Sequence, residues 1–192
     1  MTAKYINSNE ARQMISKTAS SRFQASRRFM LHNYLSLFSV SFFSLVLIIT
    51  SIPQVANYKF LVNPTLFNIG QLSLSILLLS LSIAIGLSDF SLKSHQHHAC
   101  GMELNKLVTL LKNKWDQHLN PVEYNEYIEK YYSILEKYEN HSEIDYKKAN
   151  LTKCIFSKNS VFYYSRFSLY FIMISLAIGW VFFLGMPVSN EV

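Results

Sequence analysis

Three long runs without a charged residue constrain this chain more than any other feature. They lie at residues 34–52, 66–88 and 167–186. A helix rises about 1.5 Å per residue, so about 20 residues cross the roughly 30 Å hydrocarbon core of a bilayer. Because each unpaired backbone group costs several kcal/mol in lipid, such a run must be helical. The sequence therefore predicts an all-α membrane protein with three transmembrane helices.

The overall composition excludes several other classes of protein. Only 16% of the 192 residues are charged and 50% are hydrophobic, so the chain is too apolar to be intrinsically disordered. Its two cysteines are too few to hold a small secreted domain together by disulfides. We also expect the first apolar run to be a retained anchor, because residues 1–33 precede it and a cleaved signal peptide begins with only a short basic segment.

The lysines and arginines predict the orientation of the three helices, because such residues are concentrated in the cytoplasmic segments that flank a membrane. Residues 1–33 and 89–166 would lie on one side, and the loop 53–65 and the short tail 187–192 on the other. Near the membrane ends, the first side carries eleven positive residues and the second carries only Lys59. The sequence therefore places the N-terminus and residues 89–166 in the cytoplasm and the C-terminus outside.

Residues 1–33 are predicted to form a basic cytoplasmic helix that runs into the first membrane helix, since residues 8–33 contain neither proline nor glycine. We expect Arg22, Arg27 and Arg28 to contact anionic lipid headgroups. Topology and lipid contact account for the net charge of +6, so we do not expect direct binding of nucleic acid.

Residues 89–166 are predicted to form a helical hairpin between the second and third membrane helices. We expect its first helix, over residues 89–118, to continue directly from the second membrane helix. Leu104, Leu107 and Leu111 recur at spacings of four and three, which places them with Trp115 on one helix face. Helix packing or binding of a partner is the natural use of such a face.

Two helix starts are predicted in this region. Asn120 precedes Pro121, which combines a good capping residue with proline at the first helical position. Ser142 and Asp145 resemble a capping box, in which the serine oxygen accepts a backbone N–H and the acid bonds back to the capping residue. We expect a helix over residues 143–158 to follow.

The segment Asn140-His141-Ser142 with Asp145 and Tyr146 contains the residue types of a catalytic triad. A triad brings these groups from separate chain segments to a pocket, whereas residues of one turn cannot aim at a common substrate in this way. We therefore expect a capping motif and no enzymatic activity. A membrane-bound hydrolase that uses His141 and Asp145 is the alternative.

A histidine-rich stretch precedes Cys100. His95 and His98 have the spacing of two metal ligands on one helix face. The nearest acids in the sequence are Asp89 and Glu103, which leaves the ligand set incomplete. We expect a polar helix face near the lipid headgroups here, and neither a metal nor another cofactor.

Small and polar residues inside the predicted membrane helices are the candidate packing or pore residues. Gln71, Ser75, Ser82 and Gly86 fall on one side of the second helix, and Ser44 lies in the first. Such residues let membrane helices approach closely and hydrogen-bond to one another. They would either pack a monomeric bundle or line a water path in a homo-oligomer. None of the three runs contains an ionisable residue, which argues against an ion-coupled transporter.

The order of these features resembles the SLATT-domain family of bacterial membrane effectors. The resemblance rests on the basic segment 19–29, the pair of membrane helices within 34–88, the segment 95–111, and the segment 131–146 with its Asn-His-Ser-x-x-Asp-Tyr motif. It covers most of residues 10–150. The family is described as having two membrane helices, so the third helix would be an extension.

The resemblance implies an antiphage effector of the bacterial inner membrane. The outer side, on which the charge distribution places the C-terminus, would then be the periplasm. Such an effector would oligomerise and permeabilise the membrane in abortive infection when a linked sensor detects a phage. The sensor would be a defence reverse transcriptase, to whose group the Asn-His-Ser motif looks most similar, or a nucleotide-signal synthase. The alternative is a non-enzymatic scaffold that anchors a cytoplasmic partner through its helical hairpin.

The charge distribution makes the topology testable with a reporter enzyme that is active only in the periplasm. Fused after Val192, the reporter should be active, because no positive residue follows the third run to hold that end in the cytoplasm. Fused at Glu139, it should be silent. Reporter activity in intact cells measures both fusions. The reverse pattern would overturn the orientation, and activity at both sites would remove the third span.

Overall fold

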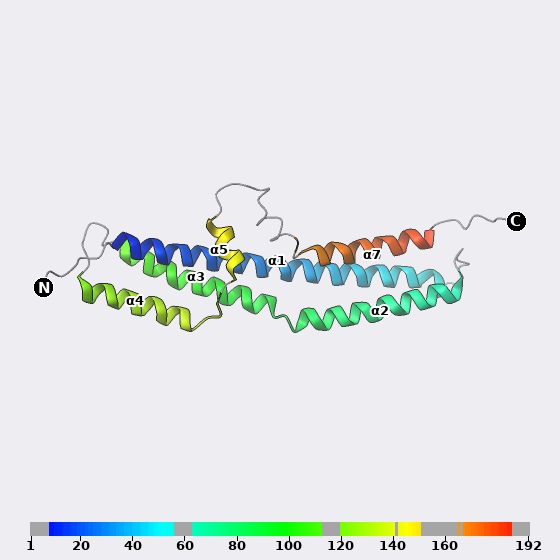
Figure 1. Cartoon of the computed structure of the whole chain (residues 1–192). Coiled ribbons are helices and arrows are strands. Elements are labelled where there is room, and N and C mark those ends of the chain that lie inside the picture. The colour runs from blue at the N-terminus through cyan, green and yellow to red at the C-terminus, as the bar shows by residue number, and fades with distance from the viewer. Residues whose placement is uncertain are drawn as a thin grey trace. The chain divides into compact units, whose positions relative to one another are not determined.

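The computed structural model describes residues 8–55, 63–112, 120–140, 142–150, 165 and 167–185. Its helices are α1 (Ser8–Val55), α2 (Pro64–Gly86), α3 (Phe90–Lys112), α4 (Pro121–Glu136), α5 (Glu143–Asn150) and α7 (Ser168–Gly185) (Figure 1). No strand is present in these ranges, so the all-α prediction is confirmed. The chain divides into two compact units, Met1–Leu31 with Phe90–Tyr163 (unit 1) and His32–Asp89 with Tyr164–Val192 (unit 2).

α1 is one continuous helix that contributes to both units. Residues 8–52 contain no proline or glycine that would interrupt it. The prediction that the basic N-terminal helix continues into the first apolar run is therefore confirmed. Side chains at alternating spacings of four and three residues are buried or half-buried along the whole helix, and we call them the α1 stripe. The stripe consists of Ala11, Ile15, Thr18, Arg22, Ala25, Phe29, His32, Ser36, Ser39, Phe43, Val46 and Thr50.

The apolar core of unit 1 is built from α1, α3 and α4. Leu104, Leu107 and Leu111 of α3 are at most 4% exposed, so the predicted leucine face is confirmed for these three residues. Ile15 of α1 and Tyr131 of α4 pack into the same cluster. The predicted fourth member of the face, at position 115, lies outside the described residues.

The predicted start of α4 is confirmed, and its cause is local. The Asn120 side chain accepts a hydrogen bond from the Glu123 N–H at 2.8 Å, and Pro121 occupies the first helical position. α5 begins at Glu143 as predicted and is described to Asn150. The rest of the helix predicted over 143–158 lies outside the described residues.

α2 and α3 are separate helices, so the prediction that residues 89–118 continue the second membrane helix is wrong. α2 ends at Gly86 and α3 begins at Phe90. Between them Asp89 has a φ of 48°, in the left-handed region. Aspartate tolerates this conformation better than most side chains, but a right-handed helix cannot pass through it.

Unit 2 contains α2, α7 and the second half of α1. Phe43, Val46, Leu47 and Ala177 are buried in a small cluster. Most other apolar side chains are exposed, and the most apolar stretch of Pro64–Lys112 has 0% of its residues buried.

These exposed surfaces match lipid rather than water. A core helix of a soluble protein would be largely buried, and contiguous exposed apolar surface marks a membrane or partner contact. Asn9–Ile52 and Pro64–Lys112 each contain a helical stretch that is long and apolar enough to cross a membrane, which in the second range lies in α2, and Ser168–Phe183 is a shorter apolar helix. The structure therefore supports a membrane location, while the third span and the hairpin remain predictions.

A glycine permits the close contact between α7 and α2. The Trp180 indole lies over Gly70 and stacks on the Phe67 ring with 6.0 Å between centroids. A Cβ atom at position 70 would lie 2.8 Å from Cζ3 of the indole, closer than real Cβ contacts. At Gly86, by contrast, a Cβ atom would meet nothing within 4 Å.

Gly70→Ala should therefore lower the free energy of unfolding, by about 1–3 kcal/mol, because it overpacks the α2–α7 contact. Gly86→Ala is the matched control on the same helix, and it should be neutral or stabilise by up to about 1 kcal/mol through helix propensity. Unfolding of the full chain in detergent, followed by circular dichroism, measures both variants. Equal behaviour of the two would contradict the close approach at Gly70.

Candidate functional site

A buried ion pair ties α5 to α1 in unit 1. Arg28 Nε donates to Asp145 Oδ1 and Arg28 Nη2 donates to Asp145 Oδ2, each at 2.9 Å. The two side chains are only 7% and 0% exposed. Asp145 also accepts the Ser142 N–H at 3.3 Å and the Ser142 hydroxyl at 2.9 Å. We call this arrangement the Arg28–Asp145 clasp.

The clasp keeps Asp145 ionised. Burial by itself raises the pKa of this carboxyl, because a charged group loses its hydration. The hydrogen bonds and charge of Arg28, together with the two hydrogen bonds from Ser142, outweigh burial and hold the pKa below its usual value. An ionised carboxylate engaged in this way is not placed to exchange protons with a substrate.

Arg22 of the α1 stripe is a second buried arginine, and it has no carboxylate partner among the described residues. Arg22 is 1% exposed, and its guanidinium donates to the Glu139 carbonyl and lies 3.5 Å from His97 Nδ1. The Arg22 Nε atom has no hydrogen-bond partner in the described part of the chain. His97 stacks on Phe29, with 5.4 Å between ring centroids. Unit 1 therefore holds two buried guanidinium groups and a polar layer beside its apolar core.

The structure corrects the expectation that Arg22, Arg27 and Arg28 all face lipid headgroups. Arg27 is exposed, but Arg22 and Arg28 are buried inside unit 1. Arg22 lies seven residues from both Ile15 and Phe29, so it falls on the same helix face as these apolar residues. This spacing is the feature of the sequence that indicates a buried position for Arg22.

The Asn-His-Ser-x-x-Asp-Tyr segment places the Ser142 and Asp145 side chains at the clasp and leaves others outside. Asp145 is buried, whereas Asn140 and Tyr146 are exposed, and His141 lies outside the described residues. The Ser142 hydroxyl donates to the Asp145 carboxylate, a contact that the capping-box prediction did not include. The acid half of the box is present, since Asp145 accepts the Ser142 N–H.

The histidine-rich stretch of α3 splits between the two sides of the helix. His95 and His98 are exposed, and Cys100 is buried in the core. Among the described residues, no group of three histidine, cysteine, aspartate or glutamate side chains could hold a metal ion.

The candidate pore residues of unit 2 differ in their surroundings. Gln71 Nε2 donates to the Ser51 hydroxyl of α1, so it packs between helices. Ser75 and Ser82 donate to carbonyls of their own helix at 2.8 Å, and Ser44 does so in α1 at the same distance. Gly86 is exposed. Only Gln71 of this set therefore makes a polar contact between helices in the described part of the chain.

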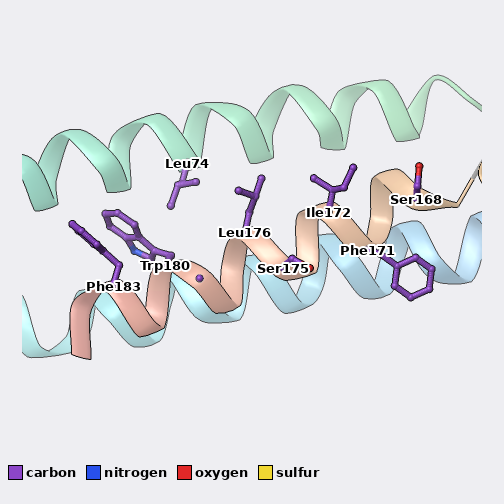
Figure 2. A pocket seen from close by; sticks show the side chains of 9 residues that line it. Leu74, Ser168, Phe171, Ile172, Ser175, Leu176, Trp180 and Phe183 are labelled. Carbon is purple, nitrogen blue, oxygen red and sulfur yellow. The ribbon is translucent and has the colours of Figure 1, made fainter. Parts of the chain in front are cut away.

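An apolar groove of about 800 Å³ lies between α2 and α7. Figure 2 shows Leu176 and Ile172 of α7 pointing toward α2, with Leu74 opposite. Among the described residues, Ser168 and Ser175 are the only hydroxyl side chains that line it. A groove with so few polar groups suits lipid acyl chains better than a soluble ligand.

Comparison with known protein families decides the identity of the chain. Residues 7–188 match the family described as SMODS and SLOG-associating 2TM effector domain family 5. The chain belongs to this SLATT family. No curated protein and no solved structure matches it. The resemblance inferred from the sequence is confirmed, and the match extends through α7.

The family description agrees with the geometry of unit 2. It specifies two transmembrane segments and an effector role, and two apolar helices of this SLATT protein are long enough to cross a membrane.

The sequence pattern does not indicate the clasp, although Arg28 and Asp145 are both candidate functional residues. Each was assigned a local role, whereas their contact joins segments 117 residues apart.

Asp145→Asn should destabilise the folded chain at pH 7 by about 3–5 kcal/mol, because it leaves the buried Arg28 charge unpaired. The folded-state pKa of Asp145 is depressed, so its contribution is complete above the unfolded value of about 3.9 and is lost as pH falls through the folded value. The difference between wild type and variant should therefore shrink below about pH 4. Urea unfolding of the full chain at pH 7 and pH 3 measures this.

Glu143→Gln is the matched control for this prediction. Glu143 lies on the same helix and pairs with Lys147 at 2.7 Å, but both side chains are exposed. It should change stability little at either pH. A loss equal to that of Asp145→Asn would show that any carboxylate of α5 has the same effect, and the buried clasp would not be the cause.

Proposed function

We propose that this protein is an antiphage effector of the bacterial inner membrane, which self-associates and permeabilises the membrane in abortive infection. The surface of unit 2 carries the proposal. Its helices expose apolar side chains, while polar atoms of Ser39, Gln71 and Trp180 are buried without a partner in the described residues. Membership of a family of effector domains supports the same function.

We place three helices in the membrane, with α7 as the third. α7 has 18 residues, which extend about 27 Å and nearly match the hydrocarbon core. The excess of lysine and arginine places residues 1–33 and 89–166 in the cytoplasm and the C-terminus in the periplasm. The fusion after Val192 tests this arrangement directly.

Permeabilisation would require several copies of the chain. Three helices are too few to enclose a wide water column, and none of the apolar runs carries a charge that would mark a path within one chain. Ser75 and Ser82 are bonded to their own helix backbone. Hydroxyls satisfied in this way tolerate lipid, a helix interface or water, so this side of α2 can change its surroundings at small cost.

A trigger would act through the cytoplasmic unit. A linked sensor, either a defence reverse transcriptase or a nucleotide-signal synthase, would bind unit 1 more tightly in the conducting arrangement and shift the population toward it. The Arg28–Asp145 clasp is the proposed restraint of the resting arrangement, because breaking a buried pair is costly unless a new partner compensates. No enzymatic step is part of this mechanism.

Leakage of induced cells tests the proposed function. Ser75→Leu with Ser82→Leu should suppress uptake of a membrane-impermeant dye to near background, because it removes the hydroxyls proposed to face water. Ser73→Leu with Ser80→Leu is the matched control, with two hydroxyls at the same seven-residue spacing on the opposite side of α2. These hydroxyls also bond to their own backbone, and the control should leave leakage unchanged.

The outcomes separate the proposal from its alternatives. Equal leakage from both variants would contradict a water path along the Ser75 side of α2. Absence of leakage from wild-type cells that accumulate the protein would favour the scaffold function instead. Membrane accumulation of every variant is measured in the same cells, so that loss of protein is not mistaken for loss of function.

A further inference from the structure

A groove on the surface of unit 1 combines an apolar floor with a basic rim. It lies between α3 and α4 and has a volume of about 310 Å³. Its apolar side chains are Leu107, Leu110 and Ile134, and its lysines are Lys106, Lys130 and Lys137. Glu103 and Ser133 complete the lining, so three positive side chains are set against one negative side chain. Leu110 is 54% exposed, although it is a large apolar residue at the surface. We call this surface the basic groove.

The lysines of the basic groove have capacity for a further carboxylate. Lys106 has no ion-pair partner among the described residues, and Lys137 lies 3.5 Å from Glu103. Lys130 pairs with Glu126 at 2.6 Å, but both side chains are more than half exposed, so water competes for this pair. Each ammonium group has three N–H donors, which leaves room for a second acceptor.

A complementary surface lies on the neighbouring side of α4. Glu129 and Glu136 are seven residues apart and share one helix face with Tyr132, which is 55% exposed. Asn125 and Val122 extend the same face toward the start of α4, and Val122 is 78% exposed. This face, the acidic stripe, combines negative charge with exposed apolar and aromatic surface.

We propose that the acidic stripe of one copy docks in the basic groove of a second copy. Glu129 and Glu136 span two helical turns, or about 10.5 Å. Lys130 and Lys137 are separated by the same seven residues, so both carboxylates can meet lysines in one register. Tyr132 lies between the two acids and matches the exposed Leu110 of the groove floor. The acidic stripe and the basic groove therefore complement each other both in charge and in apolar surface.

Two different surfaces of the same chain meet in this contact. If each stripe meets the groove of the other copy, a two-fold dimer satisfies both surfaces, whereas a head-to-tail contact leaves one free groove and one free stripe and extends to a ring or an open chain. The inference rests on the proposed function, since it identifies the cytoplasmic contact through which the effector would self-associate.

Paired charge reversals test the docking, because recovery of association in a mixture of two variants shows that both variants are folded. The groove variant is Lys106→Glu with Lys130→Glu, and the stripe variant is Glu129→Lys with Glu136→Lys. Lys137 is left unchanged because it also pairs with Glu103. Each variant alone places like charges across the contact, so the concentration for half-association of the full chain in detergent should rise about tenfold or more.

A mixture of the two variants should restore association. The unchanged stripe of the groove variant meets the unchanged groove of the stripe variant, and the two reversed surfaces also have opposite charge. Resonance energy transfer between differently labelled copies should therefore be strong for unlike copies and weak for like copies. Lys17→Glu with Lys112→Glu, at two exposed positions, has the same charge change as the groove variant and should associate as wild type does.

Four results would be decisive. Normal association of the groove variant alone or of the stripe variant alone would overturn the proposal. Failure of the mixture of the two variants to recover association would also overturn it. Loss of leakage from a variant that still associates would assign the groove to an acidic partner protein instead, which also overturns it. Association through these surfaces in cells that never leak would uphold the docking and remove the pore function, so the two proposals fail separately.

Discussion

The rest of the structure depends on the α1 stripe, in which every third or fourth side chain of a single long helix is buried. In unit 1 the stripe contributes Ile15 to the apolar core and Arg22 to the polar layer. In unit 2 it contributes Phe43 and Val46 to the cluster with Ala177 of α7. A 3–4 spacing keeps one helix face toward its neighbours over its full length, whatever the chemistry of the side chains. Backbone periodicity therefore organises both units, and side-chain chemistry distinguishes them.

Features that depend on local period and composition were predictable from the sequence. The apolar runs, the leucine face of α3 and the Asn120 cap of α4 each need only a few neighbouring residues to be recognised. The break at Asp89 was missed because a left-handed residue between two helical stretches leaves no mark on the hydrophobic pattern. The pattern around Ser142 predicts a cap, but it does not predict that the Ser142 hydroxyl donates to the nearby Asp145 carboxylate.

The Arg28–Asp145 clasp was not predictable by the same means. An arginine next to an apolar run is ordinarily at the headgroup layer, and an aspartate after a serine is ordinarily part of a cap. Their pairing depends on tertiary structure that brings together residues 117 positions apart. Composition favours the surface for both residues, since charged side chains are buried only when paired. The position of Arg22 on the α1 stripe was the available indication that charge is buried in this unit.

The two units differ in how their buried polar groups are satisfied, and this difference suits a protein with two arrangements. In unit 1 the Arg28 guanidinium and the Asp145 carboxylate satisfy each other across helices, so separation of α5 from α1 leaves two charges without partners. Such a pair adds little net stability but disfavours intermediate arrangements strongly. In unit 2, Ser44, Ser75 and Ser82 are satisfied within their own helices, so a change of neighbour leaves their hydrogen bonds intact. Under the proposed function, the energetic barrier to rearrangement lies with the charged contacts of unit 1, whereas the hydrogen bonds of these three serines do not oppose a change of neighbour.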